Sequence, residues 1–213
     1  MNRPVLFLDF DNTITQGDLL DAVLERFSKD NSWLELEDAW RSGKISTLEC
    51  LRGQVGNLKP SRTAILEFAV TISVDPHFVP IADWAARSNV DLIVLSDSFT
   101  ALIDAVFKHH DIPNVPVFAN ELKFFADRVE AEFPYQDPSC ARCAHCKARQ
   151  IRKFPGQRTI FVGDGLSDIC PANIADIVFA KDSLARHLAQ SNKKFLPFHS
   201  LQTVLNFLLE EHS

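Results

Sequence analysis

The 213-residue sequence has no long apolar run, no block of basic residues, and no repeated or low-complexity segment. No apolar stretch approaches the roughly 18 residues that a membrane-spanning helix needs. The N-terminal apolar run Val5–Leu8 is short and leads directly into an acidic segment, unlike a secretory signal peptide. The formal net charge of −6 argues against a general nucleic-acid binder. These absences predict a soluble, cytoplasmic protein with no nucleic-acid or membrane partner, and they carry no signal for its oligomeric state.

The sequence also lacks the cysteine pattern of a disulfide framework, because its five cysteines are odd in number. Cys140, Cys143 and Cys146 are spaced C-x2-C-x2-C, a pattern that fits a metal site better than disulfides. Three thiolates and a fourth ligand, His145 or His110, would suit Zn²⁺, and a similar spacing occurs in iron–sulfur proteins. Because no fourth ligand is obvious beyond these histidines, we favour the alternative, a loop of small, partly buried thiols.

What the sequence does contain is enough apolar material, 46% of residues, for a sizeable core. Continuous apolar runs, rather than alternating ones, are typical of parallel strands that are buried on both faces. Four such runs predict strands, and helical patterns lie between and after them. The predicted strands are 5–9, 92–95, 159–162 and 176–180, and the later helices are 99–109, 183–190 and 201–209. This order predicts a doubly wound, Rossmann-like parallel α/β sheet.

One long helical stretch, from about Asp18 to Arg87, interrupts this order after the first strand. It includes a capping box, Ser46-x-x-Glu49, that is typical of a helix start. Because roughly 12 residues suffice for a crossover, a stretch of about 70 predicts an inserted helical cap. We therefore predict an α/β core at residues 1–15 and 88–213 and a cap at 16–87. A β-hairpin within 117–133 and a Cys-rich loop are predicted before the helix that carries Lys147.

Polar side chains stand where the predicted strands end. Asp9 and Asp11, in DFDNT, follow the first strand, Ser96 follows the second, and Asp164 follows the third. In open α/β sheets the carboxyl ends of the strands border the ligand site, so these residues should converge. Clustered carboxylates of Asp9, Asp11 and Asp164 are tolerable if they hold a hard cation, and Mg²⁺ prefers oxygen ligands and substrate phosphates. Lys147 and Ser96 would then supply a charge and a hydroxyl for the phosphate.

Four segments together, DFDNT, VLSDS, Lys147 at a helix start and GDGLSD, resemble the motifs of the haloacid-dehalogenase-like phosphatases. They occur in the right order over residues 5 to 180, and the helical insert resembles the first type of cap in that superfamily. The resemblance implies a Mg²⁺-dependent phosphomonoester hydrolase that acts on a small phosphorylated metabolite through an aspartyl-phosphate.

The resemblance also implies roles for individual residues. Asp9 would be the nucleophile, and Asp11 the general acid and base. The substrate phosphate would be bound by Thr13, Ser96 and Lys147. The metal would be held by the Asp9 side chain, the Asp11 carbonyl and the Asp164 side chain, with Asp168 supporting the site.

The stretches SCARCAHCK and GDGLSDICP resemble two groups in particular: the phosphoethanolamine/phosphocholine phosphatases and the diketo-methylthiopentyl-phosphate phosphatases of methionine salvage. The aspartate after Ser96 favours the first group, in which residues matching Asp18 and Asp97 are proposed to contact the amine. The alternative for each aspartate is a helix cap. Phosphoserine phosphatases are a further possibility, but where they carry a carboxylate-binding arginine this chain has Gln54.

Two other classes of function remain open. A non-catalytic phosphate-binding module would be expected to have lost Asp9, Asp11, Lys147 or Asp164, and all four are present. A phosphotransferase or phosphonatase would share the covalent step. A phosphonatase needs a Schiff-base lysine from the cap, and the cap lysines have no distinguishing sequence context.

Overall fold

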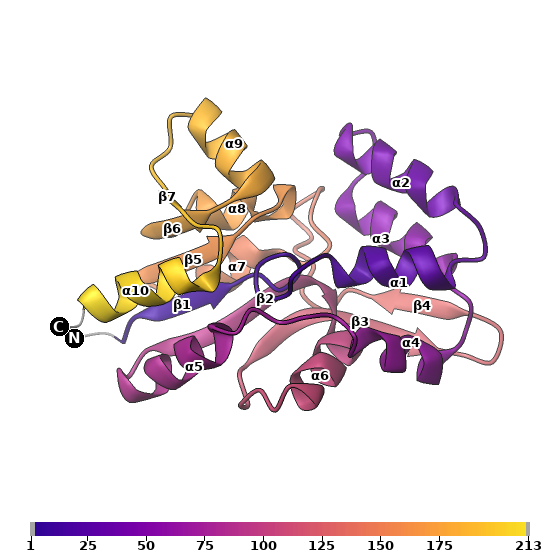
Figure 1. The fold of residues 1–213 in the computed structure, drawn as a ribbon. Helices are drawn as coiled ribbons and strands as arrows, with labels where there is room; N and C mark the ends of the chain where they lie inside the picture. Colours follow the sequence, from indigo (N-terminus) through magenta and orange to yellow (C-terminus); the bar gives the residue numbers. More distant parts are fainter. Residues whose placement is uncertain (1–2, 212–213) are drawn as a thin grey trace.

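The computed structural model describes residues 3–211 and is built around one seven-stranded sheet (Figure 1). The strand order is β4-β3-β2-β1-β5-β6-β7, and all neighbours are parallel except β3 and β4. The strands are β1 (Val5–Leu8), β2 (Asp91–Phe99), β3 (Val117–Phe124), β4 (Val129–Glu132), β5 (Thr159–Gly163), β6 (Ile177–Ala180) and β7 (Leu196–Pro197). This confirms the predicted α/β, doubly wound sheet.

The sheet is covered on both faces, as the continuous apolar strands predicted. Leu6 and Leu8 of β1 face a core made with helices α5 (Phe78–Arg87), α6 (Thr100–His109) and α10 (Leu201–Glu211). Val5 and Phe7 face the opposite core, which includes residues of α7 (Lys147–Ile151), α8 (Ile169–Ala172) and α9 (Asp182–Gln190). Because β1 lies at the centre with all four residues buried, the residues that follow it are held rigidly at the sheet edge.

Four helices follow β1 before the chain reaches α5: α1 (Leu19–Phe27), α2 (Ser32–Arg41), α3 (Thr47–Gly56) and α4 (Arg62–Ala69). Helices α2 and α3 pack together and stand above α1 in Figure 1. The predicted capping box opens α3, since Ser46 and Glu49 exchange both hydrogen bonds. Helix α3 packs on β4 and α4 packs on α6, whereas α5 packs on β2 and α10. The division into a core and a cap at 16–87 stays a prediction.

Several elements differ in extent from the sequence-based expectation. Strand β2 continues to Phe99 rather than ending at Leu95, with a shift in its register against β3 between these residues. The predicted hairpin is present as β3 and β4, which are antiparallel. Two-residue β7 was not expected, because a strand that short leaves no periodic pattern. Among residues 3–211, no helix is long and apolar enough to cross a membrane.

Candidate active site

Asp9 lies directly after β1, at the carboxyl edge of the sheet. Its N–H donates to the carbonyl of Val162 at 2.9 Å, which continues the pairing of β1 with β5. Its carboxylate is buried, and Oδ1 accepts from Nζ of Lys147 at 2.7 Å. The pairing of β1 with both β2 and β5 therefore brings the first motif next to the polar residues that follow those strands.

Lys147 and Asp168 form the centre of the polar network. Nζ of Lys147 lies 2.7 Å from Oδ1 of Asp9 and 2.7 Å from Oδ1 of Asp168. Burial alone would lower the pKa of Lys147, but the carboxylates of Asp168 and Asp9 outweigh it and raise the pKa well above its ordinary value. The ammonium group is thus held in its charged form although the side chain is buried.

Asp168 also organises the loop after β5. Its Oδ2 accepts the N–H groups of Asp164 at 3.0 Å and Gly165 at 3.1 Å. A side chain on Gly163 would place its Cβ 2.5 Å from this oxygen, so glycine is required by the close approach of Asp168. Both oxygens of Asp168 are therefore engaged, one with the lysine and one with the loop, and its role in supporting the metal site stays a prediction.

Asp164 faces the same space, and its Oδ1 accepts from the hydroxyl of Thr13 at 2.9 Å. Thr13 is buried and does not line the cavity described below, so in this structure its hydroxyl orients a carboxylate. The expected contact of Thr13 with a phosphate stays a prediction. The hydrogen bond ties the first motif to the loop after β5 across 151 positions of the chain.

The carboxylates carry more negative charge than Lys147 can offset. Burial, the charge of Asp168 and then that of Asp164 raise the pKa of Asp9 well above its ordinary value, against the opposing effect of Lys147. Burial and then Asp168 raise the pKa of Asp164 to about 7. Carboxylate oxygens of Asp9, Asp164 and Asp168 lie within 4.8 Å of one another. An all-oxygen, undercompensated anionic cluster of this size fits a hard divalent cation.

Asp11 lies next to this cluster and joins it to α1. Its Oδ1 accepts the N–H of Leu19 at 2.8 Å. Its pKa is raised well above the ordinary value, first by burial and then by the charge of Asp18. Asn12, which follows, has φ of 56°, in the left-handed region of backbone conformation.

Asp18 is the N-cap of α1, since its Oδ1 accepts the N–H of Asp21 at 2.9 Å. The helix-cap alternative is therefore confirmed for Asp18, which nevertheless also lines the cavity. For Asp97 the helix-cap alternative is wrong, because α6 begins at Thr100 with Phe99 as its N-cap. Instead, Oδ1 of Asp97 accepts the N–H of His145 at 3.1 Å.

Ser96 is fully buried beneath the cavity, and its Oγ accepts the N–H of Ser98 at 2.9 Å. Ser98 is a residue that sequence reasoning missed. It lines the cavity, and its buried Oγ has no hydrogen-bond partner among the described residues. Its place in the VLSDS motif was the available signal, whereas strand alternation was not, because the register of β2 shifts between Leu95 and Phe99 and both Asp97 and Ser98 line the cavity.

A cavity of about 130 Å³ lies between the sheet edge and the helices that follow β1. Its floor includes Asp9, Asp11, Lys147 and Asp164. The opposite wall is formed by Asp18, Leu20, Asp21, Glu37, Trp40, Thr47, Cys50, Leu51 and Gln54. Among all lining residues Lys147 is the one with a basic side chain, and it is already paired with Asp9 and Asp168.

The polar groups of this wall are partly bonded to one another. Glu37 accepts from Nε2 of Gln54 at 3.1 Å and from Nε of Arg41 at 2.8 Å, and the indole of Trp40 donates to Thr47 at 3.0 Å. Burial and then Asp18 raise the pKa of Asp21 to about 7. The wall therefore offers hydrogen-bonding groups and apolar surface, and burial raises the pKa values of its two aspartates, Asp18 and Asp21.

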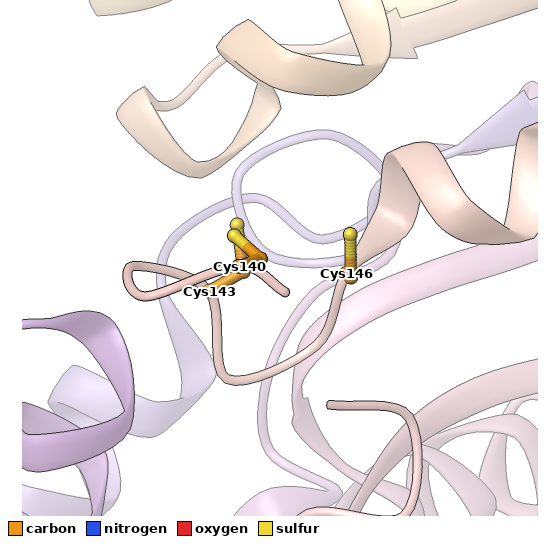
Figure 2. Close-up of side chains that lie close together, drawn as sticks. All are labelled: Cys140, Cys143 and Cys146. Atoms are coloured by element: carbon orange, nitrogen blue, oxygen red, sulfur yellow. The ribbon is translucent and has the colours of Figure 1, made fainter. Parts of the chain in front are cut away.

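The Cys-rich loop lies immediately before α7, which begins at Lys147. The Sγ atoms of Cys140, Cys143 and Cys146 lie within 4.8 Å of one another, and all three point to the same side (Figure 2). The two histidines considered as a fourth ligand lie outside the group of thiols within 4.8 Å of one another, and Nε2 of His145 is buried with no hydrogen-bond partner among the described residues. His145 contacts the carbonyl of Ser96 through Nδ1 at 2.8 Å, and His110 contacts that of Ile72 through Nε2 at 3.1 Å.

Comparison with known proteins agrees with this geometry. The model of a family described as Putative Phosphatase matches residues 4–197. A 2-hydroxy-3-keto-5-methylthiopentenyl-1-phosphate phosphatase of Brevibacillus brevis is 30% identical over 217 residues, which cover 97% of each chain. A protein of the same name from Bacillus thuringiensis (strain Al Hakam) is 27% identical over 215 residues, covering 96% of this chain and 97% of the other.

Solved structures support the fold. A substrate-bound phosphoserine phosphatase superposes with a TM-score of 0.74 at 16% identity, covering 97% of this chain and 99% of the other. The phosphoserine phosphatase of T. onnurineus gives a TM-score of 0.73 at 16% identity, covering 97% and 94%. At this level of identity the likeness concerns the arrangement of the chain.

Proposed function

This chain belongs to the putative phosphatase family, within the haloacid-dehalogenase-like superfamily, and from that premise we propose that it is a Mg²⁺-dependent phosphomonoesterase for 2-hydroxy-3-keto-5-methylthiopentenyl-1-phosphate. The chain is a phosphatase. The observation that carries the proposal is the buried Asp9–Lys147–Asp168 network beside Asp11 and Asp164, at the floor of the cavity.

Asp9 is the proposed nucleophile. Its carboxylate would attack phosphorus, the bond from phosphorus to the ester oxygen would break, and the phosphoryl group would remain on Asp9 as an acyl phosphate. Lys147, 2.7 Å from Asp9, would hold the carboxylate in place and offset the negative charge that the phosphoryl oxygens bring.

Asp11 is the proposed general acid and base. Burial and the charge of Asp18 raise the pKa of Asp11 well above its ordinary value, which favours the protonated form that can donate to the leaving oxygen. The same group, then ionised, would take a proton from the water that attacks the acyl phosphate. Its hydrogen bond from Leu19 would keep it directed into the cavity through both steps.

The donor set fits Mg²⁺, which would be held by the carboxylates of Asp9 and Asp164 and the carbonyl of Asp11. When bound, it would neutralise the carboxylate cluster and the substrate phosphate. Thr13 would keep Asp164 in orientation, and Asp168 would keep the loop of Asp164 in place. We propose Ser96 and Ser98, near the carboxyl end of β2, as the phosphate-binding hydroxyls.

The substrate part of the proposal rests on the two relatives, which are similar over nearly their whole length. It departs from our first expectation, phosphoethanolamine or phosphocholine, which these relatives do not support. A leaving group with hydroxyl, keto and methylthio groups is uncharged, and the wall opposite the floor presents Leu20, Trp40 and Leu51 with the amide of Gln54. Asp21, with a pKa of about 7, would bind such a group as a hydrogen-bond donor.

Phosphoserine is the less suitable substrate, even though phosphoserine phosphatases share the fold. Its carboxylate would lie against Asp18, Asp21 and Asp97 with no unpaired cation on the described cavity wall. Gln54, which occupies the place where an arginine was expected for that activity, donates to Glu37. Repulsion between like charges in this acidic cavity therefore acts against phosphoserine.

The test is a comparison of kcat/KM for three substrates: the methylthiopentenyl phosphate, phosphoethanolamine and phosphoserine. We expect kcat/KM to decrease in that order, and a preference for phosphoethanolamine would restore the amine hypothesis.

The variant Asp97→Asn tests whether Asp97 selects the substrate. The ratio of kcat/KM for the methylthiopentenyl phosphate to kcat/KM for phosphoethanolamine should change by less than about threefold in this variant. A larger loss for phosphoethanolamine alone would indicate that Asp97 binds an amine. Asp83→Asn, at an exposed position on α5, is the matched control.

A further inference from the structure

The three thiols of the Cys-rich loop already have nearly the spacing of metal ligands. Zn–S bonds of about 2.3 Å in a tetrahedral site place sulfur atoms about 3.8 Å apart. Since the Sγ atoms of Cys140, Cys143 and Cys146 all lie within 4.8 Å of one another, a movement of at most about 1 Å would bring them to that spacing. An iron–sulfur cluster binds its thiolates through different iron atoms and needs them farther apart.

The backbone of the loop is also arranged to receive thiolates. The N–H groups of Arg142 and Cys143 donate to Sγ of Cys140, and the N–H of Arg149 donates to Sγ of Cys146. Burial raises the pKa of Cys140, but the hydrogen bonds from the Arg142 and Cys143 backbone and from the Cys143 side chain outweigh it and leave the pKa below its ordinary value. Burial raises the pKa values of Cys143 and Cys146, and a bound cation would offset that effect, because the thiolate is the form that binds metal.

A fourth cysteine comes from a separate segment. Cys170 is exposed on α8 and lies outside the group of three thiols within 4.8 Å of one another, so its side chain would have to turn toward them to bind the same ion. Its charge nevertheless contributes, after burial and Cys140, to raising the pKa of Cys143. Repulsion among neighbouring thiolates is what a bound cation removes. Cys170 follows Asp168 by two positions, and Cys146 precedes Lys147 by one, so the four cysteines flank the two halves of the Lys147–Asp168 ion pair.

We infer that Cys140, Cys143 and Cys146 bind one Zn²⁺, with Cys170 as the fourth ligand. The metal would link the loop before Lys147 to helix α8, which begins just after Asp168, and would hold those two partners at their 2.7 Å separation. This zinc site is distinct from the carboxylate cluster, which offers oxygen ligands, and the inference does not depend on the identity of the substrate.

The experiment is a titration of metal-free protein with Co²⁺ under reducing conditions, followed by displacement with Zn²⁺. Thiolate ligation gives an intense sulfur-to-cobalt charge-transfer band in the near ultraviolet, which carboxylate ligation does not produce. We expect this band to saturate at about one Co²⁺ per chain, and elemental analysis of protein purified without chelator to give about one zinc per chain.

Cysteine-to-serine variants distinguish the proposed zinc ligands from Cys50, a thiol outside the site. Cys140→Ser should weaken Zn²⁺ binding by more than about tenfold, measured by competition with a chromophoric chelator. Cys50→Ser, a change in a thiol of α3 outside the loop, should leave Zn²⁺ affinity unchanged. Cys170→Ser should weaken binding as well, and unchanged affinity in that variant would overturn the choice of fourth ligand.

The inference as a whole is overturned if wild-type protein shows no charge-transfer band with Co²⁺, or if Cys140→Ser binds Zn²⁺ as tightly as wild type. Iron and visible absorption in the purified protein would likewise overturn it in favour of an iron–sulfur centre. None of these measurements depends on phosphatase activity. The substrate proposal can therefore fail while the zinc proposal is confirmed, and the zinc proposal can fail while the substrate proposal is confirmed.

Discussion

At the scale of single residues, the active site depends on buried charges whose partners lie far away in the sequence. Asp9 and Lys147 are separated by 138 positions in the chain and are joined by a 2.7 Å hydrogen bond in a buried environment. Each would be costly to bury alone, and the loss of one leaves the other uncompensated. Single substitutions here should therefore separate the chemical role of a side chain from its role in stability.

Asp9→Asn should lower kcat for a generic aryl phosphate by at least about 10³-fold, because an amide cannot serve as the nucleophile. The amide keeps the size and can still accept from Lys147, so the circular dichroism spectrum should be unchanged. Substantial residual activity would contradict the covalent mechanism.

Asp11→Asn should lower kcat by about 10²- to 10⁴-fold, the usual contribution of general acid–base catalysis. With an aryl phosphate, whose leaving group needs little protonation, the first step should survive and the second should stall. Acid-quenched mass spectrometry should then find phosphate on Asp9. Absence of the phosphorylated species in a variant that is still slowly active would show that Asp11 is not the base.

At the scale of elements, the strand ends and their loops set the geometry. Strand β5 ends at Gly163, where the chain turns so that Asp164 and Gly165 donate to Asp168. The loop can make this turn only because Gly163 leaves room for the carboxylate behind it. Strand β5 and the loop after it therefore position Lys147 indirectly, through Asp168.

Gly163→Ala should displace Asp168 and loosen Lys147, because the new Cβ would meet Oδ2 of Asp168 at 2.5 Å. Overpacking of this kind typically costs about 1–3 kcal/mol of stability, and kcat should fall with it. Gly56→Ala is the matched control, since nothing lies within 4 Å of its added Cβ at the end of α3. Equal unfolding temperatures for the two variants would contradict the steric argument.

At the scale of the whole molecule, the helices after β1 enclose acids above the sheet edge. Asp21 in the folded chain has a pKa of about 7, against an ordinary value of 3.8. Between these values the folded state binds more protons than the unfolded state, so the contribution of Asp21 to stability falls as pH rises through this range. Above about pH 7 the buried charge destabilises the enclosed arrangement in full.

Asp21→Asn should therefore raise the unfolding temperature relative to wild type, and the difference should be larger at pH 8 than at pH 5. Differential scanning calorimetry at the two pH values measures it. Asp38→Asn, at an exposed position of α2, controls for the loss of one carboxylate elsewhere in the same group of helices. A difference that does not grow with pH would show that Asp21 ionises freely in the folded chain.

The sequence alone determined the elements whose causes are local. Continuous apolar runs predicted the buried parallel strands, the Ser46–Glu49 pattern predicted the start of α3, and the order of the motifs predicted the superfamily. It also predicted which residues would follow the strands, because the carboxyl ends of parallel strands must share an edge.

Only the tertiary structure decided which of those side chains contact one another and which hydrogen bonds they form. That Thr13 donates to Asp164, that Asp97 accepts from His145, and that Ser98 faces the cavity follow from packing between segments far apart in the chain. Cys170 is close enough to Cys143 to affect its pKa for the same reason. The hydrogen bond that each polar group makes depends on which distant segment the sheet register places beside it, and a local sequence pattern does not contain that register.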